Sequence, residues 1–166
     1  MRATKGLLLV IATIVGGNAG AHKDRPIELT SAGELRGLPK QYQPARLELS
    51  NTDQGRVSLQ LGKASTVFPE CISQFFRRAD RNRIWVTASW YHDPSHLPYY
   101  LNIRLEESGS DDEWWSLLIS LDSANVLFID HVVVTDGGNG RQHDRIDPTE
   151  ICTPEEQSQL IPRAAN

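Results

Sequence analysis

Four consecutive runs of β-branched and aromatic residues fill the middle of this chain and limit what it can fold into. The runs cover residues 83–91, 97–106, 114–121 and 125–135. This composition is typical of β-strands. Only short polar segments separate the runs, and strands joined by short connections pair antiparallel. The sequence therefore predicts an antiparallel meander of four strands.

An amphipathic helix is predicted directly before the meander. Apolar side chains recur at spacings of three and four between residues 68 and 79, which places them on one helical face. Ser65 and Thr66 are candidate N-caps, and Pro69 suits a first turn. We expect the helix to end near Asp80 and to pack its apolar face on the sheet.

Weaker patterns complete the expected element order. Alternating residues predict short strands at 26–30, 45–50 and 55–61. The glycine-rich turn after Thr135 is expected to lead into a polar loop that reaches Asp147.

A capping box predicts a short C-terminal helix. Thr153 and Glu156 have the spacing of this motif, so a helix is expected from there to about residue 161.

The elements together predict an α+β fold, with one amphipathic helix packed on a four- to six-stranded, mostly antiparallel sheet and a short C-terminal helix. A helix followed by four antiparallel strands resembles the cystatin-like and nuclear-transport-factor-2-like architectures. The hairpin at residues 115–129 also looks like hairpins of small exported or immunity domains. This resemblance is architectural, and an architecture by itself transfers no functional residue.

The N-terminus has the order of a secretory signal peptide. Arg2 and Lys5 precede an apolar run at residues 6–15, and Ala19-Gly20-Ala21 follows. The run has ten residues, whereas a membrane-spanning helix needs about 20. We therefore expect cleavage after Ala21, a periplasmic or secreted bacterial protein, and no membrane anchor in the mature chain.

The expected mature chain is one globular domain. Residues 22–166 number 145, with 15 basic and 21 acidic side chains and a formal charge of −6. This length suits a single domain, whose ordered core we expect at about 45–162. The acidic balance argues against a nucleic-acid partner.

Cys71 and Cys152 are the only cysteines. In an oxidising compartment such a pair most simply forms one disulfide. A bond that closes 80 intervening residues stabilises a fold by about 4 kcal/mol in the chain-entropy model. A redox or metal-binding thiol pair is the less favoured alternative, because the C-x-x-C spacing is absent.

Alternation along the meander divides its side chains between two faces. One face is aliphatic and is expected to lie beneath the helix. Its members are Ile84, Val86, Ala88, Trp90, Leu97, Tyr99, Leu101, Ile103, Leu105, Trp115, Leu117, Ile119, Leu121, Val126, Phe128, Val132 and Val134, with Asp130 as an irregular member.

The other face mixes aromatic and polar side chains, as protein-binding surfaces do. We expect it to bind a protein partner through Trp85, Tyr91, Tyr100, Arg104 and Trp114. The alternative is that the N-terminal strands or a second monomer cover this face.

Metal and cofactor sites are not favoured. His92 and His96 flank a proline turn, where an i, i+4 spacing loses its helical meaning. Oxygen-bearing side chains between Asp136 and Asp147 offer ligands for calcium, but their spacing departs from the EF-hand loop. We expect no cofactor, and calcium binding by this loop stays an open alternative.

Catalysis is not favoured either, because nucleophile-elbow, P-loop and dinucleotide motifs are absent from the sequence. The leading hypothesis is an exported, non-enzymatic binding protein, such as a periplasmic inhibitor or an immunity protein. The alternative is a small-ligand binder or small hydrolase with a pocket in the curved sheet. That reading needs Asp130 with His131, or Glu106 with Asp122, to converge.

One basic cluster has two interpretations. Arg77, Arg78, Arg81 and Arg83 follow the predicted helix. They suit the negative end of a solvated helix, or a contact for an acidic partner.

Overall fold

The computed structural model of the protein describes residues 24–49, 55–89, 99–109 and 111–160. It confirms the antiparallel meander, whose neighbouring strands pair in sequence order. The four strands are β6 (Ala79–Ser89), β7 (Tyr100–Glu107), β8 (Glu113–Ser120) and β9 (Val126–Thr135).

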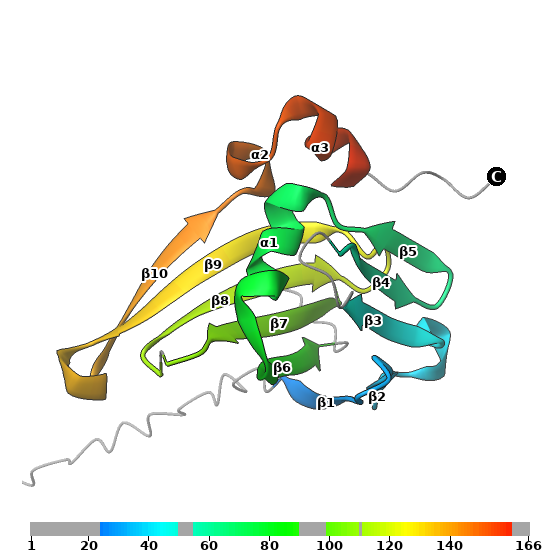
Figure 1. Cartoon of the computed structure of the whole chain (residues 1–166). Helices are drawn as coiled ribbons and strands as arrows, with labels where there is room; N and C mark the ends of the chain where they lie inside the picture. Colours follow the sequence, from blue (N-terminus) through cyan, green and yellow to red (C-terminus); the bar gives the residue numbers. More distant parts are fainter. Residues whose placement is uncertain (1–23, 50–54, 90–98, 110, 161–166) are drawn as a thin grey trace, which may run out of the picture.

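The large sheet has seven strands, so the expected four to six is too few. Its order is β10-β9-β8-β7-β6-β1-β2, as Figure 1 shows. The added strands are β1 (Arg25–Leu29), β2 (Leu35–Arg36) and β10 (Gly140–Ile146). The first two lie upstream of residue 45, where we expected the ordered core to begin.

β10 corrects the expected polar loop. Gly137 and Gly138 adopt positive φ in the turn η2 (Asp136–Gly138), and the chain then pairs with β9 from Gly140 to Ile146. The free edge of β9 offers backbone donors and acceptors to any segment that returns along it. Pairing at that edge outweighs the polar composition of β10.

A small second sheet contains β3 (Ala45–Leu49), β4 (Val57–Leu61) and β5 (Ala64–Val67). Ser65 and Thr66 lie in β5, so the prediction that they cap the helix is wrong. They pair with β4, and Pro69 occupies the N-cap position of α1 (Glu70–Arg78) without a side-chain cap.

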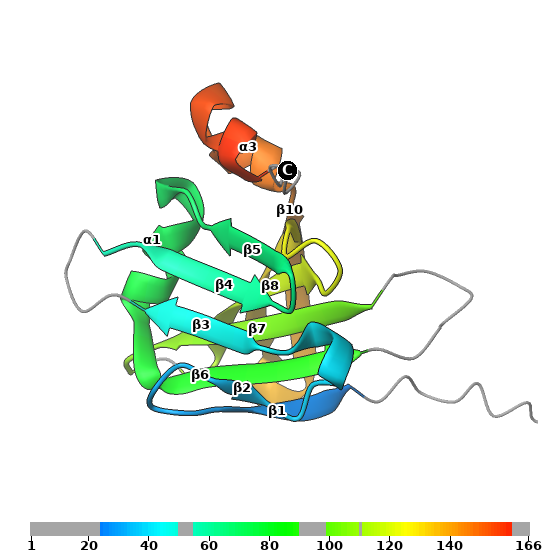
Figure 2. The same cartoon turned by 90° about the vertical axis from the view of Figure 1, so that its right-hand side faces the viewer.

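α1 and the small sheet together cover one face of the large sheet, which we call the inner face (Figures 1 and 2). The core between them combines side chains from α1, both sheets and the connecting segments. Leu47, Leu59, Ile72, Phe76, Val86, Leu101, Ile103, Leu117, Ile119 and Ile129 are among its buried members. This burial confirms the aliphatic face predicted for the first three meander strands.

The fourth meander strand departs from the predicted alternation. Ile119 pairs with Val126 while Leu118 pairs with Phe128, so the register shifts between them and Leu127 is the extra residue. A bulge of this kind exchanges the faces of all later side chains. Phe128, Val132 and Val134 therefore share a face with Leu118 and Trp114. The prediction that placed these three side chains on the core face is wrong.

The C-terminal segment forms α2 (Pro148–Ile151) and α3 (Pro154–Leu160), which confirms the short final helix. The capping box is present: Thr153 N donates to Glu156 Oε2 at 2.9 Å, and Glu156 N donates to Thr153 Oγ1 at 3.3 Å. The expected Cys71–Cys152 disulfide is formed, with Cα atoms 5.2 Å apart, and links this segment to α1.

A remaining 3-10 turn, η1 (Lys40–Tyr42), connects β2 to β3.

Within the described residues, none of the helices has the length and apolar character needed to cross a membrane.

Candidate functional site

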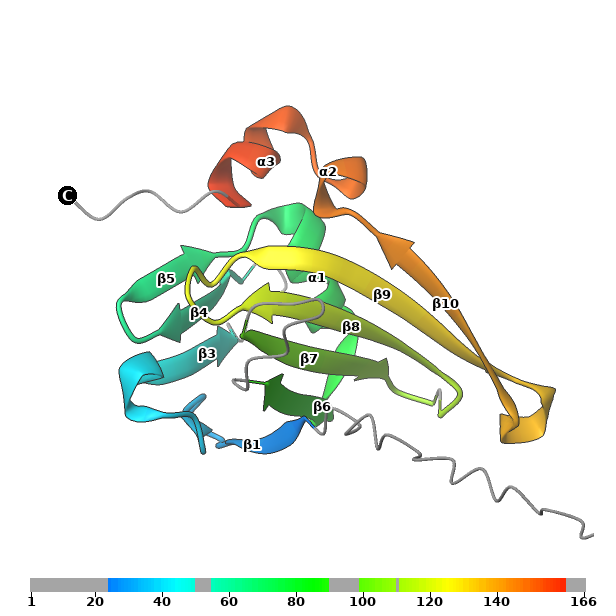
Figure 3. The ribbon, with the colours of Figure 1, turned by 180° about the vertical axis from the view of Figure 1, so that it is seen from behind.

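The face of β6–β10 opposite α1 is the candidate site, and we call it the outer face. No described helix or strand lies over it, as Figure 3 shows. Side chains from these five strands line an open hollow of about 720 Å³. Its charged or titratable lining residues are Arg83, Arg104, Glu106, Asp130, Arg141 and His143. The remaining lining side chains are Trp85, Thr87, Asn102, Trp114, Ser116, Leu118 and Val132.

The structure brings three of the five predicted binding residues into this hollow: Trp85, Arg104 and Trp114. Tyr100 lies two and four residues before Asn102 and Arg104 on β7, so it shares their face. Its hydroxyl donates to Asp24 Oδ1 at 2.7 Å, outside the hollow lining. Tyr91 lies outside the described residues.

The two tryptophans of the hollow differ in exposure. Trp85 is 58% exposed, whereas Trp114 is only 7% exposed. The Arg104 guanidinium lies 3.6 Å from the Trp114 ring centroid, and that of Arg141 lies 5.6 Å from it. Trp114 is therefore the floor of the hollow, and Trp85 is the tryptophan that is open to solvent.

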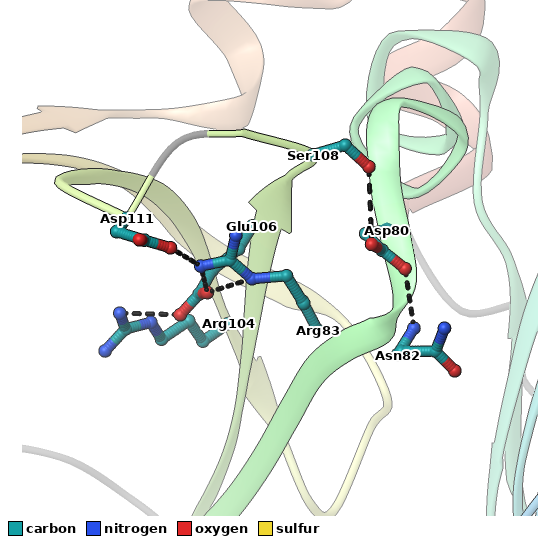
Figure 4. Close-up of polar contacts among 7 residues, drawn as sticks. All are labelled: Asp80, Asn82, Arg83, Arg104, Glu106, Ser108 and Asp111. Carbon is teal, nitrogen blue, oxygen red and sulfur yellow. Dashed lines mark hydrogen bonds and ion pairs between the residues drawn. The ribbon is translucent and has the colours of Figure 1, made fainter.

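Glu106 is the centre of an ion-pair network at one end of the hollow (Figure 4). Its side chain is 7% exposed. Glu106 Oε2 accepts from Arg83 Nε at 2.8 Å, and Oε1 lies 2.6 Å from Arg104 Nη2. The network fixes the guanidinium of Arg104 over Trp114.

Asp111 extends this network into solvent. Its Oδ1 lies 2.6 Å from Arg83 Nη2, and its side chain is 88% exposed. The carboxylates of Asp111 and Glu106, in that order of effect, raise the pKa of the Arg83 guanidinium above its ordinary value. Arg83 thus stays charged across the accessible pH range.

Asp80 makes a separate set of contacts beside this network (Figure 4). Its carboxylate accepts from the Asn82 backbone N–H at 2.9 Å and from the Ser108 hydroxyl at 3.3 Å. These bonds support the start of β6, just before Arg83.

The opposite end of the hollow has a second ion pair. Arg145 Nε donates to Asp130 Oδ1 at 3.1 Å, and its guanidinium lies 3.9 Å from the Phe128 ring centroid. Arg141 and His143 stand beside this pair on β10 and are exposed. Within the described part of the chain, neither of them has a carboxylate partner.

The residue pairs required for a hydrolase do not converge. Asp130 lines the hollow, whereas the neighbouring His131 points to the inner face, where its ring stacks on Trp115 at 4.2 Å. His131 Nε2 lies 2.6 Å from Glu113 Oε1. Adjacent residues on a strand point to opposite faces, so Asp130 and His131 do not act on one substrate.

The second pair is separated in the same way. Glu106 is held by arginines in the hollow, whereas Asp122 Oδ1 accepts from the Tyr42 hydroxyl at 3.4 Å, at the other end of the sheet. Burial, followed by the nearby Asp122 carboxylate, raises the pKa of Tyr42, which therefore remains protonated at neutral pH.

The candidate metal ligands are dispersed or outside the described residues. His92 and His96 belong to the second group. Asp147 caps α2, where it accepts from the Thr149 backbone N–H at 2.8 Å and from the Thr149 hydroxyl at 2.7 Å. These bonds, the hydroxyl first, lower the pKa of Asp147. Among the residues described, no group of three or more His, Cys, Asp or Glu is placed to hold a metal.

The basic cluster after α1 does not act as one patch. Arg77 pairs with Glu70 on its own helix, and Arg78 Nε lies 3.7 Å from Glu107 Oε1. Arg83 belongs to the outer-face network. Most of the cluster is thus engaged in separate ion pairs.

Sequence reasoning did not bring Arg141, His143 and Asp130 together in one site. Arg141 and His143 were assigned to a loop, and Asp130 was named only with His131, as one residue pair for the alternative hydrolase. Two signals were present: Arg141, His143 and Arg145 alternate with other polar residues, and a lone Asp inside a strand is unfavourable on a core face. Neither signal identifies a residue of the hollow until the pairing of β9 with β8 and β10 is known.

Comparison of this chain with protein-family models, with curated protein sequences and with solved structures gives no significant match.

Proposed function

We propose that this protein is exported and non-enzymatic, and that it binds another protein through the outer face, as a periplasmic inhibitor or an immunity-type protein does. One observation carries the proposal: Trp85 is 58% exposed at a hollow whose floor is already organised by the Arg104–Trp114 stack. Tryptophan and arginine dominate the binding energy of protein interfaces.

Export is supported by two independent features. The N-terminal sequence has the charged, apolar, small-residue order of a signal peptide. The Cys71–Cys152 disulfide is compatible with an oxidising extracellular compartment.

The proposed architecture is cystatin-like or nuclear-transport-factor-2-like. The chain order of α1 followed by β6, β7, β8 and β9 supports it. In this proposal β1, β2 and β10 are additions at the two edges of the sheet, and β10 enlarges the outer face.

A second candidate function is binding of a small molecule in the same hollow. Its volume of about 720 Å³ falls within the range of about 300–1,000 Å³ typical of ligand sites. The openness of the hollow and the exposure of Trp85 favour a protein partner, because small-molecule sites bury most of their ligand.

The test compares two matched surface variants. Among the described residues, Val67 on β5 is the other exposed large hydrophobic residue, at 46%, and it does not belong to the outer face. We expect wild type and Val67→Glu to capture the same partner from envelope extract, and Trp85→Glu to lose it. Loss of a central tryptophan anchor costs about 2 kcal/mol or more, or about thirtyfold in affinity.

Both variants are checked for folding by circular dichroism and for an intact disulfide before capture. Captured proteins are identified by cross-linking and mass spectrometry. Equal capture by the two folded glutamate variants would refute a protein-binding role for the outer face.

A further inference from the structure

The charge of the outer face has a positive surplus. Four arginines line or border the hollow: Arg83, Arg104, Arg141 and Arg145. They face three carboxylates, those of Glu106, Asp111 and Asp130, and each of these carboxylates already has an arginine partner. Within the described residues, Arg141 is the member of this group without a carboxylate. The surplus is notable because the whole chain has a formal charge of −4.

Arg141 is also well placed to bind an anion. It stands on the edge strand β10, exposed, with its guanidinium 5.6 Å from the Trp114 centroid. Stacking on an aromatic face leaves the N–H edge of a guanidinium free to donate to a carboxylate. His143, two residues along the same strand face, lines the hollow beside it.

Two polar atoms in the lining are unsatisfied by the protein. Arg104 Nε and Asn102 Oδ1 are buried and have no hydrogen-bond partner. Buried polar atoms in native proteins are almost always paired, with water or a ligand where the protein offers no partner. Because both atoms are closed to solvent, they add to the polarity of the hollow floor but are not atoms that a partner contacts directly.

We infer that the outer face recognises an acidic segment of its protein partner, in which a carboxylate pairs with Arg141 and a neighbouring apolar side chain packs on Trp85. This inference rests on the proposed function and adds the chemistry of the partner. Bidentate pairing of guanidinium with carboxylate supplies both orientation and affinity.

A dense polyanion fits this face less well. Glu106, Asp111 and Asp130 lie among the arginines, and a sulfated polysaccharide or nucleic acid would bring like charges against them. A protein segment with one or two carboxylates beside apolar residues avoids this repulsion. The surplus charge and the exposed tryptophan together match such a segment.

The test uses two short synthetic peptides without tryptophan, so that a change in the protein's own fluorescence, to which Trp85 and Trp114 of the hollow contribute, reports binding. One peptide alternates glutamate with leucine, and the other has glutamine in place of each glutamate. Both are blocked at their termini. We expect the glutamate peptide to bind wild type measurably, with affinity that falls as salt rises, and the glutamine peptide to bind at least about tenfold more weakly, as expected for loss of a charge-assisted hydrogen bond.

A charge-matched pair of variants locates the effect. Arg141→Gln is expected to weaken binding of the glutamate peptide about tenfold. Arg36→Gln removes the same charge from β2 at the far edge of the sheet, where Arg36 pairs with Glu34 at 2.8 Å, and is expected to bind like wild type.

Several outcomes would overturn the inference: no binding of the glutamate peptide to wild type, equal binding of the two peptides, or equal weakening by the two arginine variants. Binding of a heparin oligosaccharide that depends on Arg141, without binding of the peptide, would also overturn it. The capture experiment tests the proposed function separately: equal capture of a protein partner by Trp85→Glu and Val67→Glu would refute the proposed function, whatever the result with the peptides.

Discussion

Glu106 is a buried carboxylate whose charge is compensated within the outer face. Its side chain is 7% exposed, and Arg83 and Arg104 lie at hydrogen-bond distance. Burial of an ion is costly, and removal of one partner leaves the others uncompensated. The single carboxylate therefore holds two guanidinium groups in place. One of them, that of Arg104, stacks on the Trp114 ring.

This arrangement makes a residue-level prediction. Glu106→Gln is expected to lower the free energy of unfolding by about 3 kcal/mol, because two guanidinium groups lose their buried counter-charge. Asp111→Asn removes the 88% exposed partner of Arg83 and is expected to cost less than about 1 kcal/mol. Urea unfolding followed by circular dichroism measures both. A similar cost for the two variants would show that Glu106 is not the centre of the network.

Asp130 illustrates how far single residues could be interpreted from sequence. It interrupts an aliphatic strand, and no local rule says that a bulge at Leu127 turns it toward Arg145. The run Val126–Ile129 is apolar at every position, so it is compatible with either alternation. The register became definite only through pairing with β8.

At the scale of elements, the N-terminus of α1 depends on the C-terminal helix. Glu156 Oε1 accepts from the backbone N–H of Cys71 at 2.9 Å, and its Oε2 accepts from that of Thr153 at 2.9 Å. One carboxylate thus caps both α1 and α3. The Cys71–Cys152 disulfide joins the same two segments covalently.

The shared cap predicts a pH-dependent stability. Hydrogen bonds from the Thr153 and then the Cys71 backbone lower the pKa of Glu156 in the folded state below its ordinary value of 4.5. A lowered carboxyl pKa stabilises the fold above the unfolded-state value, and this contribution is lost as pH falls through the folded-state value. Glu156→Gln is expected to cost about 1 kcal/mol at pH 7, as loss of a helix cap does.

The measurement is the difference in unfolding free energy between wild type and Glu156→Gln at several pH values. The difference should be constant at neutral pH and should shrink once the pH falls below 4.5. Glu155→Gln serves as the control, since it changes an exposed glutamate on the same helix. A difference that grows on acidification would contradict the role of Glu156 as the shared cap.

Element prediction succeeded where the local pattern was strong. The apolar spacing of residues 68–79 identified α1, and the Thr153–Glu156 capping box identified α3. It failed for β5 and β10, which are short or polar and gain their stability from pairing with β4 and β9. Backbone hydrogen bonds between distant segments leave little trace in side-chain composition.

At the scale of the whole molecule, the two faces of the large sheet differ in burial. The inner face lies against α1 and the small sheet and includes the fully buried Leu117. The outer face exposes Trp85, which is 58% accessible. Stability therefore depends mainly on the inner face, and recognition is proposed for the outer one.

The difference in burial between the two faces predicts that truncation of a side chain has a large effect on stability at the inner face and a small effect at the outer face. Leu117→Ala is expected to cost about 2–5 kcal/mol, because it opens a cavity in the core. Trp85→Ala removes a larger side chain but is expected to change the free energy of unfolding by no more than about 0.5 kcal/mol, as surface substitutions do. Chemical denaturation of both variants checks this contrast. A large loss for Trp85→Ala would assign the tryptophan to packing and remove the main support for its binding role.

The amino-acid sequence by itself determined the meander, the amphipathic helix, the disulfide pair and the inner face of the first three strands, because these follow from periodicity and residue chemistry within short segments. It also singled out Trp85, Arg104 and Trp114 as residues of one face. Only the tertiary structure decided that Trp114 is the buried floor, that β10 brings Arg141 and His143 to the hollow, and that Asp130 belongs there. These features depend on strand register and on pairing between segments, and the hydrogen bonds that set them connect backbone groups that every residue possesses.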